Sequence, residues 1–484
     1  MTIVADQASP TLPRAAQAPA LPAGLAVLFG FWAVGVFAAV TAYLGYGAGL
    51  ATVAALALLA SFSPRLAIAT LLVVTIFQNL ALAFFSPALA DAQGFALAQG
   101  ANYLVAAVVF AKLVVVDGQW RSRRLAGLLI ALALVGAYAL LGAMRFDFVG
   151  AAAYFRLFTV PILALAIGYH LRDRIDVRFL RRLIRMLALI VLALIFFEVL
   201  FGAGYYDIFN LPEFRLLKRP GDPDFTSLET FVETSRRSLF NFTGQLRLDL
   251  RFNMIYGPSV HPISTAYIVA GLGVALFFFR SYMLWAVCGL ALILISAKGP
   301  IVLYAMPVLC TLALRRGHLP RRRPFLLVGL YAALVVAYGL YTQDVHVRGL
   351  LDGLASLITA PWGHGLGEGG NLSSGVLSAK VLGEVLPAPV ESAIGVMAYQ
   401  MGVLALVVLA ILWRAFQRIL GRSGSMPKLY LLSAFLVLLC NGAFQEEAFA
   451  PGAFGLTAML LVLLSASLPV SAEHEGKSSS MRKN

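Results

Sequence analysis

The chain has 484 residues, of which 60% are hydrophobic and only 12% are charged, and its mean hydropathy is +0.86. A water-soluble domain of this length cannot cover so much apolar surface, so lipid must be the solvent for most of the chain. The net charge of +14 does not indicate a nucleic-acid partner. The basic residues lie in short clusters between apolar runs, where membrane orientation explains them.

Long apolar runs rich in Leu, Ala and Val predict α-helices, because lipid requires each spanning segment to satisfy its own backbone hydrogen bonds. We therefore predict an all-α polytopic transmembrane bundle of about 12–14 spans. The pair 282–297 and 299–314 is either two short spans or a re-entrant hairpin. In chain order, the candidate spans are 23–44, 46–62, 65–85, 97–116, 125–143, 155–171, 183–201, 262–280, 282–297, 299–314, 324–342, 390–413, 428–445 and 453–470.

The basic clusters predict how these spans are oriented. Each cluster follows an even-numbered span, from Arg121 through the tail that contains Lys477, so all of them fall on one side, which the positive-inside rule makes cytoplasmic. Both termini are then cytoplasmic, and residues 1–22 and 471–484 are expected to be disordered, flanking a membrane domain over 23–470. The first span lacks a clear cleavage site, which indicates a retained helix rather than a signal peptide.

Two long polar segments, about 202–261 and 343–389, are predicted to be extracytoplasmic loops. In the first, Thr226 and Glu229 have capping-box spacing, which indicates a short surface helix, although an ordinary ordered loop is an equal alternative. In the second, an amphipathic stretch over 347–360 precedes a glycine-rich turn. The backbone amides of such a turn can form an anion-binding nest, but a plain flexible loop is the simpler interpretation.

Basic residues near the predicted outer surface are candidates for phosphate binding. Arg251 and Arg247 precede the helix that starts near Pro262, where a guanidinium can clamp a phosphate or merely extend to lipid headgroups. Lys298 lies at the outward tip of two helices that are almost free of charge, against the positive-inside bias. Ionisable residues at membrane depth are costly and usually face a cavity or a partner, although a snorkelling Lys is the alternative.

Three titratable residues are candidates for proton transfer or substrate contact. His364 in the glycine-rich turn and Glu391 at the start of a span can each act as a general base, and His261 at the mouth of another span is similar. Isolated residues of these types are usually structural. The acidic pair Glu446 and Glu447 can hold a sugar or a cation, but a solvated loop is the simpler interpretation.

Several classes of activity have no support in the sequence. No HExxH, GxSxG, Walker or paired-cysteine motif occurs, so the sequence does not indicate a soluble hydrolase, an ATPase or a zinc protein. The three cysteines, Cys288, Cys310 and Cys440, lie inside apolar stretches and are expected to be small buried hydrophobic residues.

Four stretches, in this order, resemble the O-antigen ligase and O-antigen polymerase superfamily of multi-pass membrane enzymes. RFNMIYGPSVHPISTA (251–266) is similar to the family's arginine-containing segment before a helix. ISAKG (295–299) resembles its Ser-Arg-Gly turn, with Lys298 replacing Arg. RGLLDGL (348–354) with APWGHGLG (360–367) resembles the amphipathic helix and Gly-x-Gly motif. ESAIGVMAYQMGVLA (391–405) resembles the start of the helix that follows.

The resemblance implies a fold, a reaction and a place in the cell. It covers about residues 245–415 and implies polymerisation of polyprenyl-diphosphate-linked repeat units into exopolysaccharide or O-antigen, at the outer face of the bacterial inner membrane. Glu391 stands where ligases carry an essential histidine, which favours a polymerase over a ligase. The alternatives are an O-antigen ligase, a polysaccharide or lipid transporter, and a non-catalytic assembly partner. Polyprenyl-diphosphate-linked glycan and membrane lipid are the implied partners, with chain-length regulators or export proteins as further candidates.

The implied chemistry is an inverting glycosyl transfer in which an acceptor hydroxyl displaces the lipid diphosphate. Fixed cations stabilise the charge that the leaving group gains, and Arg251 and Lys298, with Arg348 assisting, are the expected groups. Glu391 or His364 would accept the proton from the acceptor hydroxyl. No metal, cofactor or nucleotide sugar is expected.

Overall fold

The fold is taken from a computed structural model, which describes residues 21–89, 92–118, 122–218, 225–238, 251–315, 323–373, 391–421 and 425–468. The chain folds into a bundle of helices, as predicted. Two short strands, β1 (Arg236–Ser238) and β2 (Arg251–Asn253), form an antiparallel pair in which Arg236 is opposite Asn253 and Ser238 is opposite Arg251. Residues 1–20 and 469–484, and Arg247, lie outside the described residues.

The helices occur in three groups along the chain. The first group is α1 (Ala23–Leu44), α2 (Tyr46–Ser61), α3 (Pro64–Phe84), η1 (Ser86–Ala88), α4 (Ala92–Ala98), α5 (Ala101–Ala111), η2 (Lys112–Val116), α6 (Arg123–Arg145), α7 (Phe148–Leu171), η4 (Arg172–Arg174) and α8 (Val177–Phe201). The first polar loop contains α9 (Ala203–Ile208), α10 (Leu211–Lys218), α11 (Leu228–Thr234) and η6 (Gly257–Ser259). The last group is α12 (Pro262–Phe278), α13 (Tyr282–Ile295), α14 (Lys298–Arg315), α15 (Arg323–Thr342), α16 (Val345–Thr359), α18 (Ala393–Met401), α19 (Val403–Leu420), α20 (Met426–Phe444), η7 (Glu446–Phe449), η8 (Pro451–Gly455) and α21 (Leu456–Ser465).

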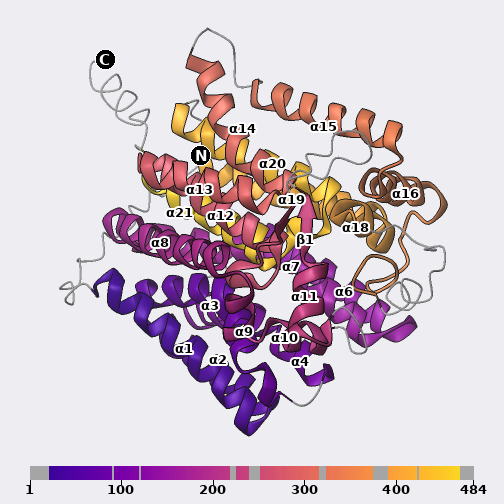
Figure 1. The fold of residues 1–484 in the computed structure, drawn as a ribbon. Helices are drawn as coiled ribbons and strands as arrows, with labels where there is room; N and C mark the ends of the chain where they lie inside the picture. The colour runs from indigo at the N-terminus through magenta and orange to yellow at the C-terminus, as the bar shows by residue number, and fades with distance from the viewer. Residues whose placement is uncertain are drawn as a thin grey trace, which may run out of the picture.

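Eight described helices are long and apolar enough to cross a membrane: α1, α3, α6, α7, α8, α15, α19 and α20. Shorter apolar helices, among them α2 and α12, pack between them. Figure 1 shows α1 and α2 on one side of the bundle and α14 and α15 on the opposite side. Helix α15 buries little of its surface, whereas most of α3 is buried, so α3 belongs to the core and α15 to the periphery.

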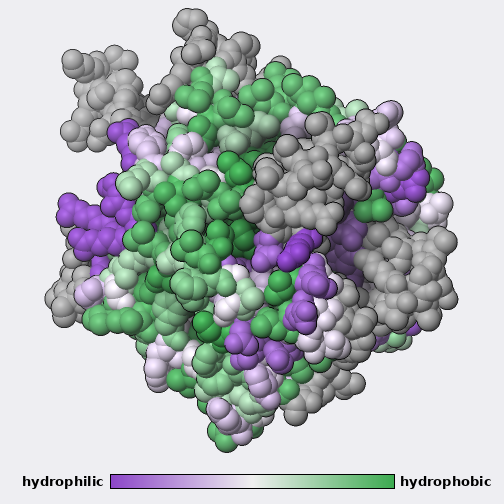
Figure 2. Space-filling model, viewed as in Figure 1, coloured by the Kyte–Doolittle hydropathy of each residue, from purple (hydrophilic) through white to green (hydrophobic). Residues whose placement is uncertain are grey.

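The surface of the bundle has the pattern expected of a protein in lipid. Figure 2 shows hydrophobic residues over much of the face around α8 and α13, with hydrophilic residues at the start of α8 and again over α10 and α11. Large apolar side chains such as Met283 and Leu200 are exposed, at 84% and 78%. An apolar band between two polar regions is what a lipid bilayer requires.

Helix ends that the sequence assigns to the same side contact each other. At the predicted cytoplasmic end, the Arg172 side chain, just after α7, donates to the carbonyl of Ile419 on α19, and Arg185 of α8 donates to Ser281 before α13. At the other end, which we call the predicted outer end, Asn441 of α20 donates to the carbonyl of Gly299 on α14. The tertiary contacts thus agree with the alternation that the spans predict.

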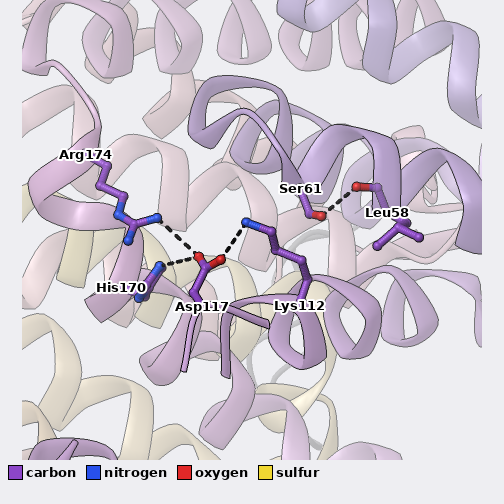
Figure 3. A network of polar contacts seen from close by, with 6 residues as sticks. All are labelled: Leu58, Ser61, Lys112, Asp117, His170 and Arg174. Carbon is purple, nitrogen blue, oxygen red and sulfur yellow. Dashed lines mark hydrogen bonds and ion pairs between the residues drawn. The ribbon is translucent and has the colours of Figure 1, made fainter. Parts of the chain in front are cut away.

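An ionic cluster stabilises the predicted cytoplasmic end (Figure 3). Asp117 accepts from Lys112 at 2.9 Å and from Arg174 at 3.3 Å, and the Nε2 atom of His170 lies 3.4 Å from the same carboxylate. Burial by itself would raise the pKa of Asp117, but the hydrogen bonds and positive charges of Lys112 and Arg174 outweigh it and lower that pKa. The cluster joins the end of η2 to the end of α7.

Two predicted spans are interrupted in the structure. The span predicted over 390–413 consists of α18 and α19, which meet at Gly402 with a φ of +58°. An added methyl group there would overlap the carbonyl oxygen of Pro361, so a close approach of the second polar loop requires glycine at this break. The span predicted over 97–116 is divided among α4, α5 and η2.

The predicted surface helix of the first loop exists as α11, but its cap is displaced by one residue. The side chain of Ser227, rather than that of Thr226, accepts the hydrogen bond from the N–H of Thr230. The predicted amphipathic stretch over 347–360 corresponds to α16, whose cap is the side chain of Asp344.

Candidate functional site

A polar cavity lies at the predicted outer end of the bundle, where α3, α5, α7 and α12 meet the turns around η7. About 950 Å³ of its space is not filled by protein atoms, part of it open to the surroundings. Apolar helices rarely enclose so many polar side chains without a function. The polar residues that line the cavity are Thr75, Gln78, Asn79, Gln99, Asn102, Arg156, Lys218, Ser259, His261, Ser264, Asn371, Glu446 and Glu447.

Arg156 projects from within α7, two turns after its start, and lines the cavity. In the described part of the chain, no carboxylate forms an ion pair with its guanidinium. Asp147 caps the start of α7, since its side chain accepts from the amides of Val149 and Gly150. Arg156 therefore lies well inside the helix. An arginine held at membrane depth without an acidic partner is a site for an anionic ligand.

Two further basic side chains border the same cavity. Lys218 ends α10, and His261 caps the start of α12, where its Nδ1 accepts from the N–H of Ser264. With Nδ1 accepting, the neutral imidazole carries its proton on Nε2, which is then a hydrogen-bond donor. The cavity thus combines a guanidinium, an ammonium and an imidazole.

Glu446 also lines the cavity and is only 4% exposed. Its Oε1 accepts from the hydroxyl of Tyr154 at 2.7 Å and its Oε2 from the N–H of Asn371 at 3.1 Å. Burial raises the pKa of Glu446 to about 7, although both hydrogen bonds favour the charged form. The interpretation of Glu446 as part of a solvated loop is therefore wrong.

Glu447 lines the cavity beside Glu446. Burial raises its pKa, and the nearby carboxylate of Glu391 acts in the same direction, whereas the charges of His346 and Lys218 act against it. A carboxyl group with a raised pKa is suited to accept a proton near neutral pH. Glu447 is therefore, together with Glu446, a candidate general base in this cavity.

The glycine-rich turn packs against the bundle and positions Glu446. The amides of His364, Gly365 and Leu366 donate to carbonyls of Tyr399, Gln400 and Tyr138. Those three amides therefore donate to backbone carbonyls and not to a bound anion. Immediately after the turn, the N–H of Asn371 donates to the carboxylate of Glu446.

Of the sequence-predicted site residues, His261 lines the cavity, whereas Glu391 and His364 belong to other local contacts. Glu391 adopts a φ of +66° beside His346, whose Nδ1 lies 3.3 Å from the Glu391 carbonyl oxygen and 4.0 Å from its carboxylate. His364 stacks on Tyr399 and pairs with Glu368 at 3.6 Å.

The other predicted basic residues lie on separate elements of the fold. Lys298 is exposed at the start of α14, next to Gly299, which packs near Gln445. Arg348 on α16 bonds to the side chain of Gln343. Arg251 belongs to β2, and Arg247 lies outside the described residues.

The segment between Arg251 and Pro262 is anchored by Glu198, a buried residue of α8 that the sequence analysis did not single out. Its carboxylate accepts from the amides of Tyr256 and Gly257, each at 2.7 Å. A second cavity of about 1030 Å³, also partly open, lies on this side and is lined by Glu198, Tyr206, Arg236 and Asn253, among others. Glu198 therefore fixes the segment that presents His261 to the first cavity.

No family model, curated protein or solved structure matches the chain. Arg156 was not predicted as a site residue, although it is the second residue of the predicted span 155–171. A charge inside an otherwise apolar run was the signal that could have identified it.

Proposed function

We propose that the chain is a membrane glycosyltransferase that polymerises polyprenyl-diphosphate-linked oligosaccharide repeat units on the outer face of the bacterial inner membrane. The observation that carries this proposal is Arg156, a cation within an apolar helix that lines a polar cavity. A lipid-linked diphosphate suits such a site, because it brings two phosphates to membrane depth on an apolar tail.

Different residues of the cavity carry out different parts of the proposed reaction. The acceptor hydroxyl oxygen attacks the anomeric carbon of the donor sugar, and the bond from that carbon to the diphosphate oxygen breaks. Arg156, Lys218 and His261 stabilise the charge on the departing diphosphate. Glu447 accepts the proton of the hydroxyl, and the charge of the Glu391 carboxylate helps to keep the pKa of Glu447 raised.

The four motifs from residue 251 to residue 405 support the same proposal, since they resemble polymerases and ligases of this kind. Two of these segments reach the cavity. The first motif contributes Ser259, His261 and Ser264 to the wall, and the turn that follows the third motif contributes Asn371, which binds Glu446.

The test is elongation of lipid-linked repeat units by the purified protein, with the products sized on a gel. Arg156→Ala is expected to lower the rate by about 10²- to 10³-fold, because one preorganised charge is lost at the leaving group. Arg182→Ala is the matched control, since Arg182 is exposed near the start of α8. Full activity of Arg156→Ala would refute the proposal, and flux of substrate into proteoliposomes without elongation would indicate a transporter.

A further inference from the structure

The wall of the cavity formed by α3 and α5 differs from the rest because it carries amide side chains and no charge. Gln78 and Asn79 lie on α3, Gln99 lies in the turn between α4 and α5, and Asn102 lies in the first turn of α5. Gln78 is fixed at both ends, since its Nε2 donates to the carbonyl of Gln99 at 2.8 Å and its Oε1 accepts from the N–H of Asn102 at 2.7 Å. Asn79 donates from Nδ2 to the carbonyl of Ser259. The wall is thus preorganised.

Three amide atoms on this wall have no hydrogen-bond partner among the described residues. They are Oδ1 of Asn79, Nε2 of Gln99 and Oδ1 of Asn102, and each is buried. Buried polar atoms are nearly always hydrogen-bonded, because leaving one without a partner costs about 1–3 kcal/mol. Three such atoms, all on residues that line one cavity, indicate a ligand that supplies both donors and acceptors.

The three unpaired atoms, two acceptors and one donor, fit only some classes of ligand. An anion would be repelled by the carbonyl oxygens of Asn79 and Asn102, a cation would lack a carboxylate on this wall, and an apolar lipid tail would leave all three atoms unpaired. A sugar ring meets the requirement, because each hydroxyl both donates and accepts.

The amide wall also adjoins the guanidinium that we assign to the diphosphate. A methyl group placed on Gly100, between Gln99 and Asn102, would lie 3.9 Å from Nη1 of Arg156. A group bound by the amides is therefore next to a group bound by Arg156.

We infer that the amide wall, defined as Gln78, Asn79, Gln99 and Asn102, binds the sugar unit that is joined directly to the donor diphosphate. This inference rests on the proposed function, and it deepens that function by assigning donor-sugar recognition to the amino-terminal helices α3 and α5. Gln99 and Asn102 contact the hydroxyl groups, whereas Gln78 is a positioning residue that orients the two segments.

The test compares two ligands on protein in lipid nanodiscs. One is polyprenyl diphosphate without sugar, and the other is the same lipid carrying its repeat-unit saccharide. The variant Gln99→Leu with Asn102→Leu is expected to bind the saccharide form about tenfold more weakly, since roughly two hydrogen bonds are lost, while its affinity for the sugar-free lipid is unchanged. Arg156→Ala is expected to weaken binding of both ligands. Gln417→Leu, an amide replacement on the exposed end of α19, serves as the control.

The outcomes separate the inference from the proposed function. Wild-type affinity of the double variant for the saccharide form would overturn the inference, as would an equal loss for both ligands at an unchanged melting temperature. If the double variant does not fold, the single variants Gln99→Leu and Asn102→Leu are used instead. For each of them, the affinity for the saccharide-bearing lipid is compared with the affinity for the sugar-free lipid. Unchanged binding of both ligands by Arg156→Ala would instead refute the proposed function.

Discussion

The hydroxyl of Tyr154 donates a hydrogen bond of 2.7 Å to Oε1 of Glu446, and this contact joins α7 to η7 across 292 positions of the chain. Both residues are buried. The same hydroxyl accepts from the N–H of Leu372 at 3.0 Å, so Tyr154 connects the carboxylate to the glycine-rich segment. The position of Glu446 in the cavity wall therefore depends on a tyrosine that lies two residues before Arg156 on α7.

Replacing Tyr154 by Phe removes that connection. Because Glu446 and the N–H of Leu372 each lose a buried partner, we expect a loss of about 1–3 kcal/mol in stability. The measurement is thermal unfolding in detergent, with Tyr341→Phe as the control, since Tyr341 is 83% exposed. Equal melting temperatures for the two variants would contradict the role given to Tyr154.

The stability of the protein should also depend on the protonation of Glu446. Its pKa is raised from 4.5 to about 7 in the folded state, so folding favours the protonated form. The contribution of this group is therefore fully present below about pH 4.5 and is lost as the pH rises through about 7. We expect the wild-type melting temperature to fall over this interval relative to Glu446→Gln, which cannot titrate. Parallel pH profiles for the two proteins would disprove the assignment.

Glu198 is expected to be essential for the segment that carries His261. The variant Glu198→Leu leaves the amides of Tyr256 and Gly257 unpaired, at a cost of about 1–3 kcal/mol for each. Thermal unfolding should show a large loss for Glu198→Leu and little change for Glu213→Leu, because Glu213 is exposed on α10. Protease sensitivity of the loop before α12 provides a second readout.

The break between α18 and α19 should require glycine at position 402. Gly402→Ala introduces a methyl group against the carbonyl oxygen of Pro361 at a φ of +58°, and we expect it to destabilise the fold by about 1–3 kcal/mol. Gly329→Ala is the matched control, since no atom lies within 4 Å of the added group within α15. Helix propensity predicts that this control stabilises the protein by up to about 1 kcal/mol. The idea fails if Gly402→Ala is as stable as the wild type.

Many of the helices could be predicted, because a hydrophobic run is visible in a short stretch of sequence and does not depend on distant contacts. The predicted span 23–44 matches α1, and the predicted span 324–342 is close to α15. The predictions were less accurate where the second polar loop approaches the bundle, at the Gly402 break, because that contact depends on Pro361, which lies 41 positions away in the chain.

The candidate site was only partly predictable. His261 was identified because it precedes a proline at the start of a span, and the structure places it in the cavity wall. Arg156 and the amides of α3 and α5 were not identified, because a single polar residue in an apolar run does not reveal which other residues face it.

Composition and the spacing of apolar runs by themselves determined that this chain is a helical membrane protein, because lipid allows few other ways to satisfy the backbone. Only the tertiary structure decided which polar residues share a cavity. Arg156, Gln99, His261 and Glu446 come from segments far apart in the sequence, and a cavity forms only where packed helices leave space between them. Whether a buried charge has a partner is likewise a property of packing, since a counterion can come from any helix that the fold brings near.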